Sequence, residues 1–190
     1  MAKASTKNTV KKATTDSPET AKRVQKRSEN FKTGQWDLKY LQFVHAFIGQ
    51  TGKTLEQIAE EAGITRQTIY HWFNKDDAKI SSIINFIEKC GYKVSFSLKP
   101  ATNNVGDALV TINRKEAPET SGTQRLSFLN DAFNVYNISR KNTAEMLGIG
   151  YTALYYWFKN DDVFMSYIYK MAEANGLKLI IKIDPAEQSS

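Results

Sequence analysis

Apolar residues between residues 37 and 100 first recur at the spacing of a helix and then alternate as in a strand. Within residues 37–50 they stand near helical spacing at Leu38, Leu41, Val44 and Ile48. Side chains three or four positions apart share one face of a helix, so this spacing predicts an amphipathic helix. The pattern predicts three further helices and then a strand, within residues 54–63, 66–74, 78–91 and 92–100.

Residues at the expected helix ends agree with these boundaries. Thr54 and Gln57 have the spacing of a capping box at the start of the second helix. Gly63 stands where that helix must end, because a tight turn favours a residue that tolerates positive φ. Thr65 can cap the third helix, and Gly91 ends the fourth. The second and third helices are therefore expected to be joined by a short turn.

The whole pattern occurs a second time, 85 residues further along the chain. Residues 63–73 read GITRQTIYHWF and residues 148–158 read GIGYTALYYWF. An ungapped alignment of residues 40–100 with residues 125–185 has 17 identities in 61 positions. A repeat of this length predicts two copies of one domain in one chain.

Each copy ends in a strand with one apolar face. Val94, Phe96 and Leu98 alternate with polar residues, and they correspond to Leu179, Ile181 and Ile183 in the second copy. A lone strand of this kind is unstable, so each needs a partner. The two strands are expected to pair either with one another or each with a short strand in residues 108–114, ALVTINR.

The repeats divide the chain into segments. We expect one domain in residues 36–100 and another in residues 121–185, joined by a linker in residues 101–120. Residues 1–35 precede the first domain, and residues 186–190 form a short tail. The expected fold class is mainly α, with four helices and a strand in each domain and the strands joined in a small sheet.

Composition limits the class of protein and the kinds of site that the chain is expected to have. With 41% hydrophobic and 24% charged residues the chain is expected to be soluble and globular. No apolar run is long enough to span a membrane and no secretory leader is expected, so we expect a cytoplasmic location. Cys90 is the single cysteine and there are two histidines, too few ligands for a Cys/His metal site. No metal or other cofactor is expected.

The net charge of +6 is concentrated at the N-terminus. Residues 1–35 carry nine Lys or Arg against three acids, whereas residues 36–100 and 121–185 are each close to neutral. This segment has few large apolar residues, so we expect a flexible basic arm. The arm can either bind DNA phosphates or serve solubility alone. Its candidate phosphate contacts are Lys11, Lys12, Arg23, Lys26 and Arg27.

The apolar positions around the turn carry a family resemblance. Ala59, Gly63, Ile69 and Trp72, with Ile58 and Ile64, resemble the helix-turn-helix of the phage repressor and Cro (XRE-type) family. In the second copy the matching residues are Ala144, Gly148, Ile149, Leu154 and Trp157. The resemblance implies two tandem helix-turn-helix domains that bind double-stranded DNA, with the third helix of each in the major groove.

Residue by residue, the resemblance implies a set of DNA contacts. Arg66 can pair with guanine and Gln67 with adenine through two hydrogen bonds each. The full set of expected base contacts is Arg66, Gln67, Tyr70, His71, Tyr151, Thr152, Tyr155 and Tyr156. The expected phosphate contacts outside the arm are Thr54, Gln57, Asn74, Lys75, Ser139 and Lys159.

Several of these residues also have simpler interpretations. His71 is either a DNA contact or a surface histidine, and His45 is expected to be structural. The exposed tyrosines expected in the second copy suit a protein partner or self-association as well as DNA. Trp72 and Trp157 are expected in the core, the adjacent acids Asp76–Asp77 and Asp161–Asp162 in helix capping, and Cys90 as unreactive filler.

These observations favour a sequence-specific DNA-binding protein, a transcriptional regulator of phage or bacterial type acting as a fused pseudo-dimer at the nucleoid. The alternative is an architectural nucleoid or virion protein, in which the folds serve assembly and the basic arm holds DNA without reading it. No nucleophile-base pair, phosphate-binding glycine loop or metal spacing is present, so an enzyme is not expected.

Overall fold

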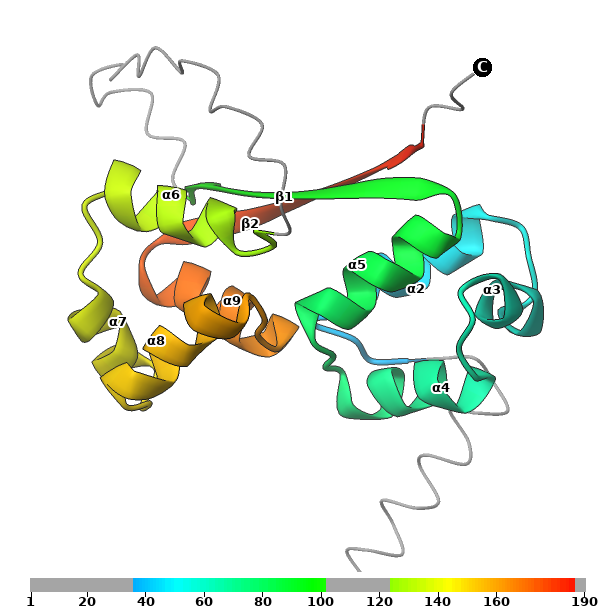
Figure 1. Cartoon of the computed structure of the whole chain (residues 1–190), viewed down its shortest axis with the longest axis horizontal. Coiled ribbons are helices and arrows are strands. Elements are labelled where there is room, and N and C mark those ends of the chain that lie inside the picture. The colour runs from blue at the N-terminus through cyan, green and yellow to red at the C-terminus, as the bar shows by residue number, and fades with distance from the viewer. Residues whose placement is uncertain (1–35, 102–123, 187–190) are drawn as a thin grey trace, which may run out of the picture. The chain divides into compact units, whose positions relative to one another are not determined.

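The computed structural model describes residues 36–101 and 124–186, which are mainly helical (Figure 1). The described residues from Asp37 onward form one compact unit. The described part of this unit contains eight helices and two strands in two successive sets. The first set is α2 (Gln42–Gln50), α3 (Leu55–Glu61), α4 (Arg66–Lys75), α5 (Ile80–Lys89) and β1 (Tyr92–Pro100). The second set is α6 (Ser127–Val135), α7 (Arg140–Met146), α8 (Tyr151–Asn160), α9 (Met165–Ala174) and β2 (Leu177–Pro185).

Most helices begin and end close to the residues expected from the sequence, but α2 begins only at Gln42, so Leu38 and Leu41 of the expected first helix precede it. Thr54 and Gln57 form the predicted capping box of α3, with Thr54 N donating to Gln57 Oε1 at 2.9 Å and Gln57 N donating to Thr54 Oγ1 at 3.3 Å. Thr65 caps α4 by accepting the Thr68 N–H at 3.2 Å. Gly63 has a φ of 64°, a left-handed conformation that glycine adopts at little cost.

The two strands pair with one another in an antiparallel sheet. Phe96 lies opposite Ile181 at the centre of the register, and Tyr92 opposite Pro185 at one end. Of the two pairings expected from the sequence, the structure confirms the direct one. The strand expected in residues 108–114 lies outside the described residues, as do the basic arm and most of the linker.

The core of each set lies mainly among its helices, and Leu98 and Leu177 are the buried residues of the two strands. In Figure 1, α5 and α9 lie beneath the sheet, and α4 and α8 lie on the side remote from it. Trp72 of α4 is buried as expected, together with Ile69 and Phe73, and it packs edge-on against Phe86 with ring centroids 5.7 Å apart. No helix in the described part is long and apolar enough to cross a membrane.

The inward face of α8, in the second set, is less deeply buried than the sequence suggests. Leu154 of α8 is buried, but Trp157, which was expected in the core, is only half-buried, as is its neighbour Phe158. Trp157 packs against Tyr167, which is itself half-buried, with ring centroids 5.2 Å apart. The expectation failed because helical spacing identifies the inward face of a helix but not the depth of the neighbours that cover it.

The adjacent acids act in capping, but not on the helices that directly follow them. Asp76 accepts the backbone N–H groups of Lys39, Tyr40 and Leu41 at 2.8–3.1 Å, just before α2. Asp161 does the same for Arg125 and Leu126 before α6, at 2.8 and 3.0 Å. Their neighbours Asp77 and Asp162 bond across to the other set. The long-range partners could not be read from sequence spacing.

Candidate nucleic-acid interface

Helices α3 and α4 are held at a fixed angle by a four-residue turn. The turn, residues 62–65, is closed by backbone hydrogen bonds from Gly63 N to Glu60 O at 2.9 Å and from Ile64 N to Ala59 O at 3.0 Å. Ala59 is buried at the crossing, where a larger side chain would separate the helices. The equivalent bond in the second set, Ile149 N to Ala144 O, is also 3.0 Å long. The turn therefore fixes how α4 is presented.

One continuous face of α4 is polar and open to solvent. Arg66 and Gln67 are exposed at its first turn, and His71, Asn74 and Lys75 follow on the same side. Tyr70 lies between them and is half-buried. The structure thus brings together on one face the six residues of α4 that the sequence assigned to base and phosphate contact. The opposite face supplies the core.

Arg66 is oriented by two neighbours. Its guanidinium lies 6.0 Å from the centroid of the Tyr70 ring, and its Nη1 is 3.9 Å from Oε2 of Glu56 in the first turn of α3. Both partners of this ion pair are exposed, so water screens it and Arg66 can leave Glu56 for another anion. Among the described residues, Glu56 is the acidic group that pairs with this expected base contact.

Thr54 and Gln57 already bond to each other's backbone, although both were expected to bind phosphate. The capping box uses Thr54 Oγ1 and Gln57 Oε1 as acceptors. A phosphate requires donors, which the Thr54 hydroxyl and the Gln57 amide group still possess. The two roles are compatible because capping and phosphate binding use different atoms.

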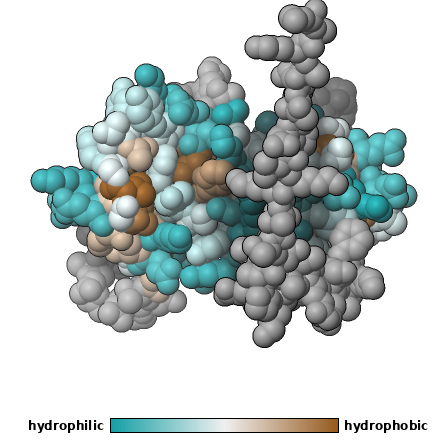
Figure 2. All heavy atoms as spheres, turned by 90° about the horizontal axis from the view of Figure 1, so that it is seen from below, coloured by the Kyte–Doolittle hydropathy of each residue, from teal (hydrophilic) through white to brown (hydrophobic). Residues whose placement is uncertain are grey.

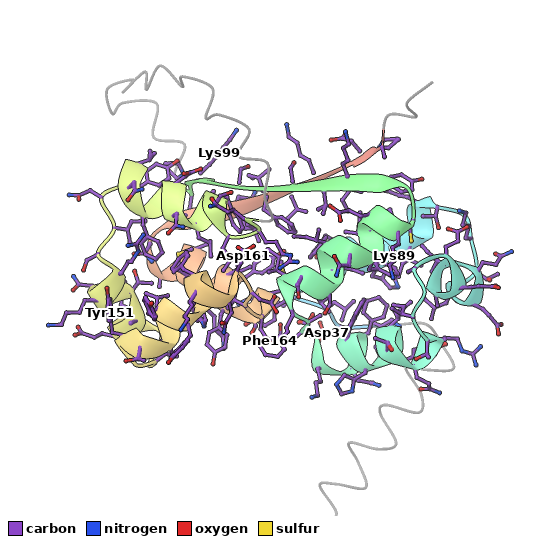
Figure 3. All side chains as sticks on the ribbon, viewed as in Figure 1. Asp37, Lys89, Lys99, Tyr151, Asp161 and Phe164 are labelled. Carbon is purple, nitrogen blue, oxygen red and sulfur yellow. The ribbon has the colours of Figure 1, made fainter. Side chains whose placement is uncertain are left out.

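Helix α8 presents an aromatic face at the equivalent place. Tyr151 and Tyr155 are each 57% exposed, Tyr156 is 48% exposed, and Thr152 and Lys159 are exposed as well. Figure 3 labels Tyr151 at the start of this helix. Lys159 Nζ lies 5.5 Å from the centroid of the Tyr156 ring. This face has fewer hydrogen-bonding groups than α4 and more apolar area.

Two basic residues at the start of α7 were missed by the sequence analysis. Arg140 and Lys141 line, with Tyr151, an open surface depression of about 650 Å³. Ser139, an expected phosphate contact, caps this helix by accepting the Asn142 N–H at 3.3 Å. The signal that could have revealed them is their position, because cations in the first turn of a helix oppose its dipole.

Arg140 is held in place by aromatic rings. Its guanidinium carbon lies 5.4 Å from the ring centroids of both Phe133 and Phe158, and Nη2 donates to Asn130 Oδ1 at 2.9 Å. The equivalent place in the first set is held by Leu55, followed by the acidic Glu56. The start of α7 is therefore basic where the start of α3 is acidic.

The surface on this side of the molecule is mixed in character. Figure 2 views the face that carries α4 and α8, where hydrophilic residues predominate and a few hydrophobic patches are visible. No group of three or more His, Cys, Asp or Glu residues among those described could hold a metal ion. The five arm residues expected at phosphates, residues 11, 12, 23, 26 and 27, lie outside the described part.

A comparison with protein families agrees with this geometry. A family model described as helix-turn-helix matches residues 47–96, from the end of α2 to the middle of β1. Residues 47–96 form a helix-turn-helix domain. The match supports the relation to the repressor/Cro family expected from the sequence, and with it a DNA-binding, regulatory protein. Neither a curated protein nor a solved structure matches the chain.

Proposed function

We propose that this protein is a sequence-specific regulator of transcription that reads double-stranded DNA with helix α4. The observation that carries the proposal is that α4 has one polar side, which faces solvent, and follows the turn of a helix-turn-helix. Arg66 and Gln67 supply the paired donors and acceptors that distinguish guanine and adenine in the major groove. The proposal places the protein at the nucleoid, without catalytic activity.

We further propose that the second set is a second helix-turn-helix unit, so that one chain acts as a fused pseudo-dimer. Support comes from contacts between the two sets that are unchanged when each residue is exchanged for its equivalent in the other set. Phe96 pairs with its own equivalent, Ile181, at the centre of the sheet. The bonds of Asp77 to Ser166 and of Asp162 to Ser81 are likewise equivalent. Such reciprocity is typical of a two-fold interface.

The two reading helices differ in chemistry, so the proposed DNA site is asymmetric. Helix α4 offers hydrogen-bonding side chains for base edges. Helix α8 offers tyrosine rings, which suit thymine methyl groups and sugars, and the nearby Arg140 and Lys141 suit phosphates. We expect most of the sequence preference in the half-site bound by α4.

The test is selection from a random duplex library at about 150 mM salt, a concentration at which non-specific binding is weakened. Wild type is compared with Arg66→Ala/Gln67→Ala and with Lys93→Ala/Ser95→Ala, whose exposed residues lie on β1. We expect an enriched asymmetric motif that loses information at two or three base pairs only in the α4 variant. Equal, salt-sensitive binding without enrichment would contradict the proposal.

The exposed tyrosines of α8 favour a second candidate. In an architectural protein, Tyr151, Tyr155 and Tyr156 would bind a protein partner or another copy of the chain, and the arm would hold DNA without reading it. The same selection distinguishes the two. Under this candidate it yields no motif, and Tyr155→Ala/Tyr156→Ala lowers the apparent mass in sedimentation velocity.

A further inference from the structure

We propose that Asp77 and Asp162 set the separation between the two half-sites that the protein recognises. Each carboxylate caps a helix of the other set and lies two residues beyond the end of its own reading helix. The inference rests on the proposed function and adds to it two residues that determine specificity without touching DNA.

The last helix of each set begins without a cap of its own. The N-cap residues are Lys79 for α5 and Phe164 for α9, and neither side chain makes a capping hydrogen bond. Helices begin with unsatisfied N–H groups, which ordinarily need an acceptor at this position. Figure 3 shows Phe164 where the two sets meet.

The missing acceptors come from the opposite set. At the start of α9, Ser166 N donates to Asp77 Oδ1 at 3.0 Å and Ser166 Oγ to Asp77 Oδ2 at 2.6 Å. At the start of α5, Ser81 N donates to Asp162 Oδ1 at 3.1 Å. Each serine is the second residue of its helix, the position that an N-cap side chain commonly serves.

Backbone bonds accompany these reciprocal caps. Ile80 N donates to Val163 O at 2.8 Å, and Met165 N donates to Ala78 O at 2.9 Å. Lys79 Nζ adds an ion pair to Asp162 Oδ2 at 3.3 Å. The side chain of Asp162 is 15% exposed and Ser166 is 8% exposed, so the aspartate bonds are partly shielded from water, although Lys79 and Phe164 beside them are exposed. Shielding strengthens charge-assisted bonds of this kind.

The path from each reading helix to this junction is short and constrained. Asp76 ends α4 in a left-handed conformation, with φ of 48°, and its carboxylate is fixed by the backbone before α2. Asp77 follows directly, and its N–H donates to Trp72 O at 3.1 Å. Asp161 and Asp162 repeat the arrangement after α8, with Asp162 N donating to Trp157 O at 3.1 Å. The aspartate that follows each reading helix therefore ties the end of that helix directly to the other set.

The sets are also joined on the side remote from the reading helices. There β1 pairs with β2 along nine residues, and Phe96 stacks on Phe128 with ring centroids 5.6 Å apart. If the aspartate caps are removed, the sheet and the two backbone bonds at the junction still hold the sets together, but the ends of α4 and α8 lose the side-chain bonds that link each to the other set. We therefore expect a folded protein with a variable separation between the reading helices.

The DNA experiment measures binding to duplexes in which base pairs are inserted between the two half-sites of the selected motif. Each added base pair shifts the second half-site by about 3.4 Å and rotates it by about 35°. Wild type should prefer one spacing by about tenfold over its neighbours, the cost of a single poor base contact. In Asp77→Ala/Asp162→Ala we expect this preference to fall to about threefold or less, with weaker binding to the best spacing.

The matched control is Asp37→Ala/Asp184→Ala, which removes the same charge at two exposed positions and should keep the wild-type preference. Asp77→Asn/Asp162→Asn, which retains an acceptor oxygen, should recover part of it. An unchanged preference in the alanine variant, or no preference in wild type that binds its motif, overturns the inference. Failure of wild type to enrich any motif instead overturns the proposed function.

A second measurement needs no DNA. Spin labels at the equivalent exposed positions Asn74→Cys and Lys159→Cys, with Cys90→Ala, report the distance between the ends of the reading helices. We expect a narrow distribution in this background and a clearly broader one when both aspartates are alanine. Circular dichroism shows whether that variant keeps its helices. A folded variant with an equally narrow distribution overturns the inference, and so does an unfolded variant, because the sheet is expected to maintain the fold.

Discussion

At the scale of single residues, Glu56 stands out as an acid beside the proposed base reader. Its Oε2 lies 3.9 Å from Nη1 of Arg66, and both side chains are exposed to solvent. We expect Glu56→Gln to raise the affinity for duplex DNA by about two- to fivefold, because it frees Arg66 and removes a charge that repels phosphate. Fluorescence anisotropy at low and moderate salt measures the change.

Glu88→Gln is the control for Glu56→Gln, since it removes an equal charge from an exposed position on α5. A gain confined to Glu56→Gln would locate the effect at the reader. Equal gains in both variants would mean that only net charge matters, and no gain would argue against Arg66 as a DNA contact.

Cys90 gives a prediction about pH. Burial raises the pKa of this thiol, and the nearby Glu61 acts in the same direction. Below about pH 8.5, the ordinary pKa of a thiol, both folded and unfolded chains hold the proton. At higher pH the unfolded chain loses it first, so the stability contributed by the neutral thiol decreases until the folded pKa is passed. Urea unfolding from pH 7 to 10 should show a shallower decline in Cys90→Ala; identical pH profiles would contradict this.

At the scale of elements, the start of α2 depends on an aspartate that ends α4. The carboxylate of Asp76 accepts hydrogen bonds from three successive backbone N–H groups. We expect Asp76→Ala to lower the free energy of unfolding by about 2 kcal/mol, because it removes these charge-assisted bonds and a residue that tolerates positive φ. Urea denaturation measures it.

Asp76→Asn is the informative comparison, because asparagine keeps one acceptor oxygen and tolerates the left-handed conformation. It should cost less than alanine. An alanine variant as stable as Asp37→Ala would show that the bonds to Lys39, Tyr40 and Leu41 contribute nothing measurable.

The packing of α7 on α9 differs from that of α3 on α5 by a paired exchange. Ile58 and Cys90 are replaced at the equivalent positions by Thr143 and Asn175. Thr143 Oγ1 and Asn175 Nδ2 are 3.3 Å apart, and Asn175 Nδ2 also donates to Met171 O at 2.8 Å. A polar pair thus occupies a place where the first set has an apolar one.

A double-mutant cycle tests this exchange. Thr143→Ile alone should destabilise the protein, because it removes a partner of a half-buried amide, and Thr143→Ile/Asn175→Cys should recover much of the stability. We expect a coupling energy of about 1 kcal/mol, since the side chains are in contact. Additive effects within error would mean that the two positions do not interact.

At the scale of the whole molecule, the excess positive charge and the proposed DNA-reading face of α4 lie in different parts of the chain. Residues 1–35 carry a charge of +6, equal to the net charge of the protein. We expect a variant lacking them to bind the selected motif less tightly and to show a smaller slope of log affinity against log salt. The slope should fall by about 0.9 for each phosphate that the arm neutralises in the full chain. Anisotropy titrations across salt measure it, and an unchanged slope would assign the arm another role.

The sequence predicted most local features of the fold, because they depend on neighbours in the chain. Thr54 with Gln57, Thr65 and Gly63 mark helix ends through bonds within a few residues, and the structure confirms each. The inward face of α4 followed from helical spacing alone. Trp157 was predicted to be more deeply buried than it is, because the residue that packs against it lies on another helix, α9. The role of Arg140 was missed because its aromatic support, Phe133 and Phe158, comes from two other helices, α6 and α8, whose packing against α7 depends on the tertiary structure.

The sequence by itself determined the order of elements, the direct repeat of their pattern and the polar face of α4, all of which follow from residue type and spacing. The tertiary structure alone decided which of two possible pairings the strands make and which helix each aspartate caps. In sequence, Asp77 and Asp162 cannot be distinguished from other acidic residues that precede a helix. Their exchange of partners depends on groups about 80 to 90 residues away, which only the folded chain brings within hydrogen-bonding distance.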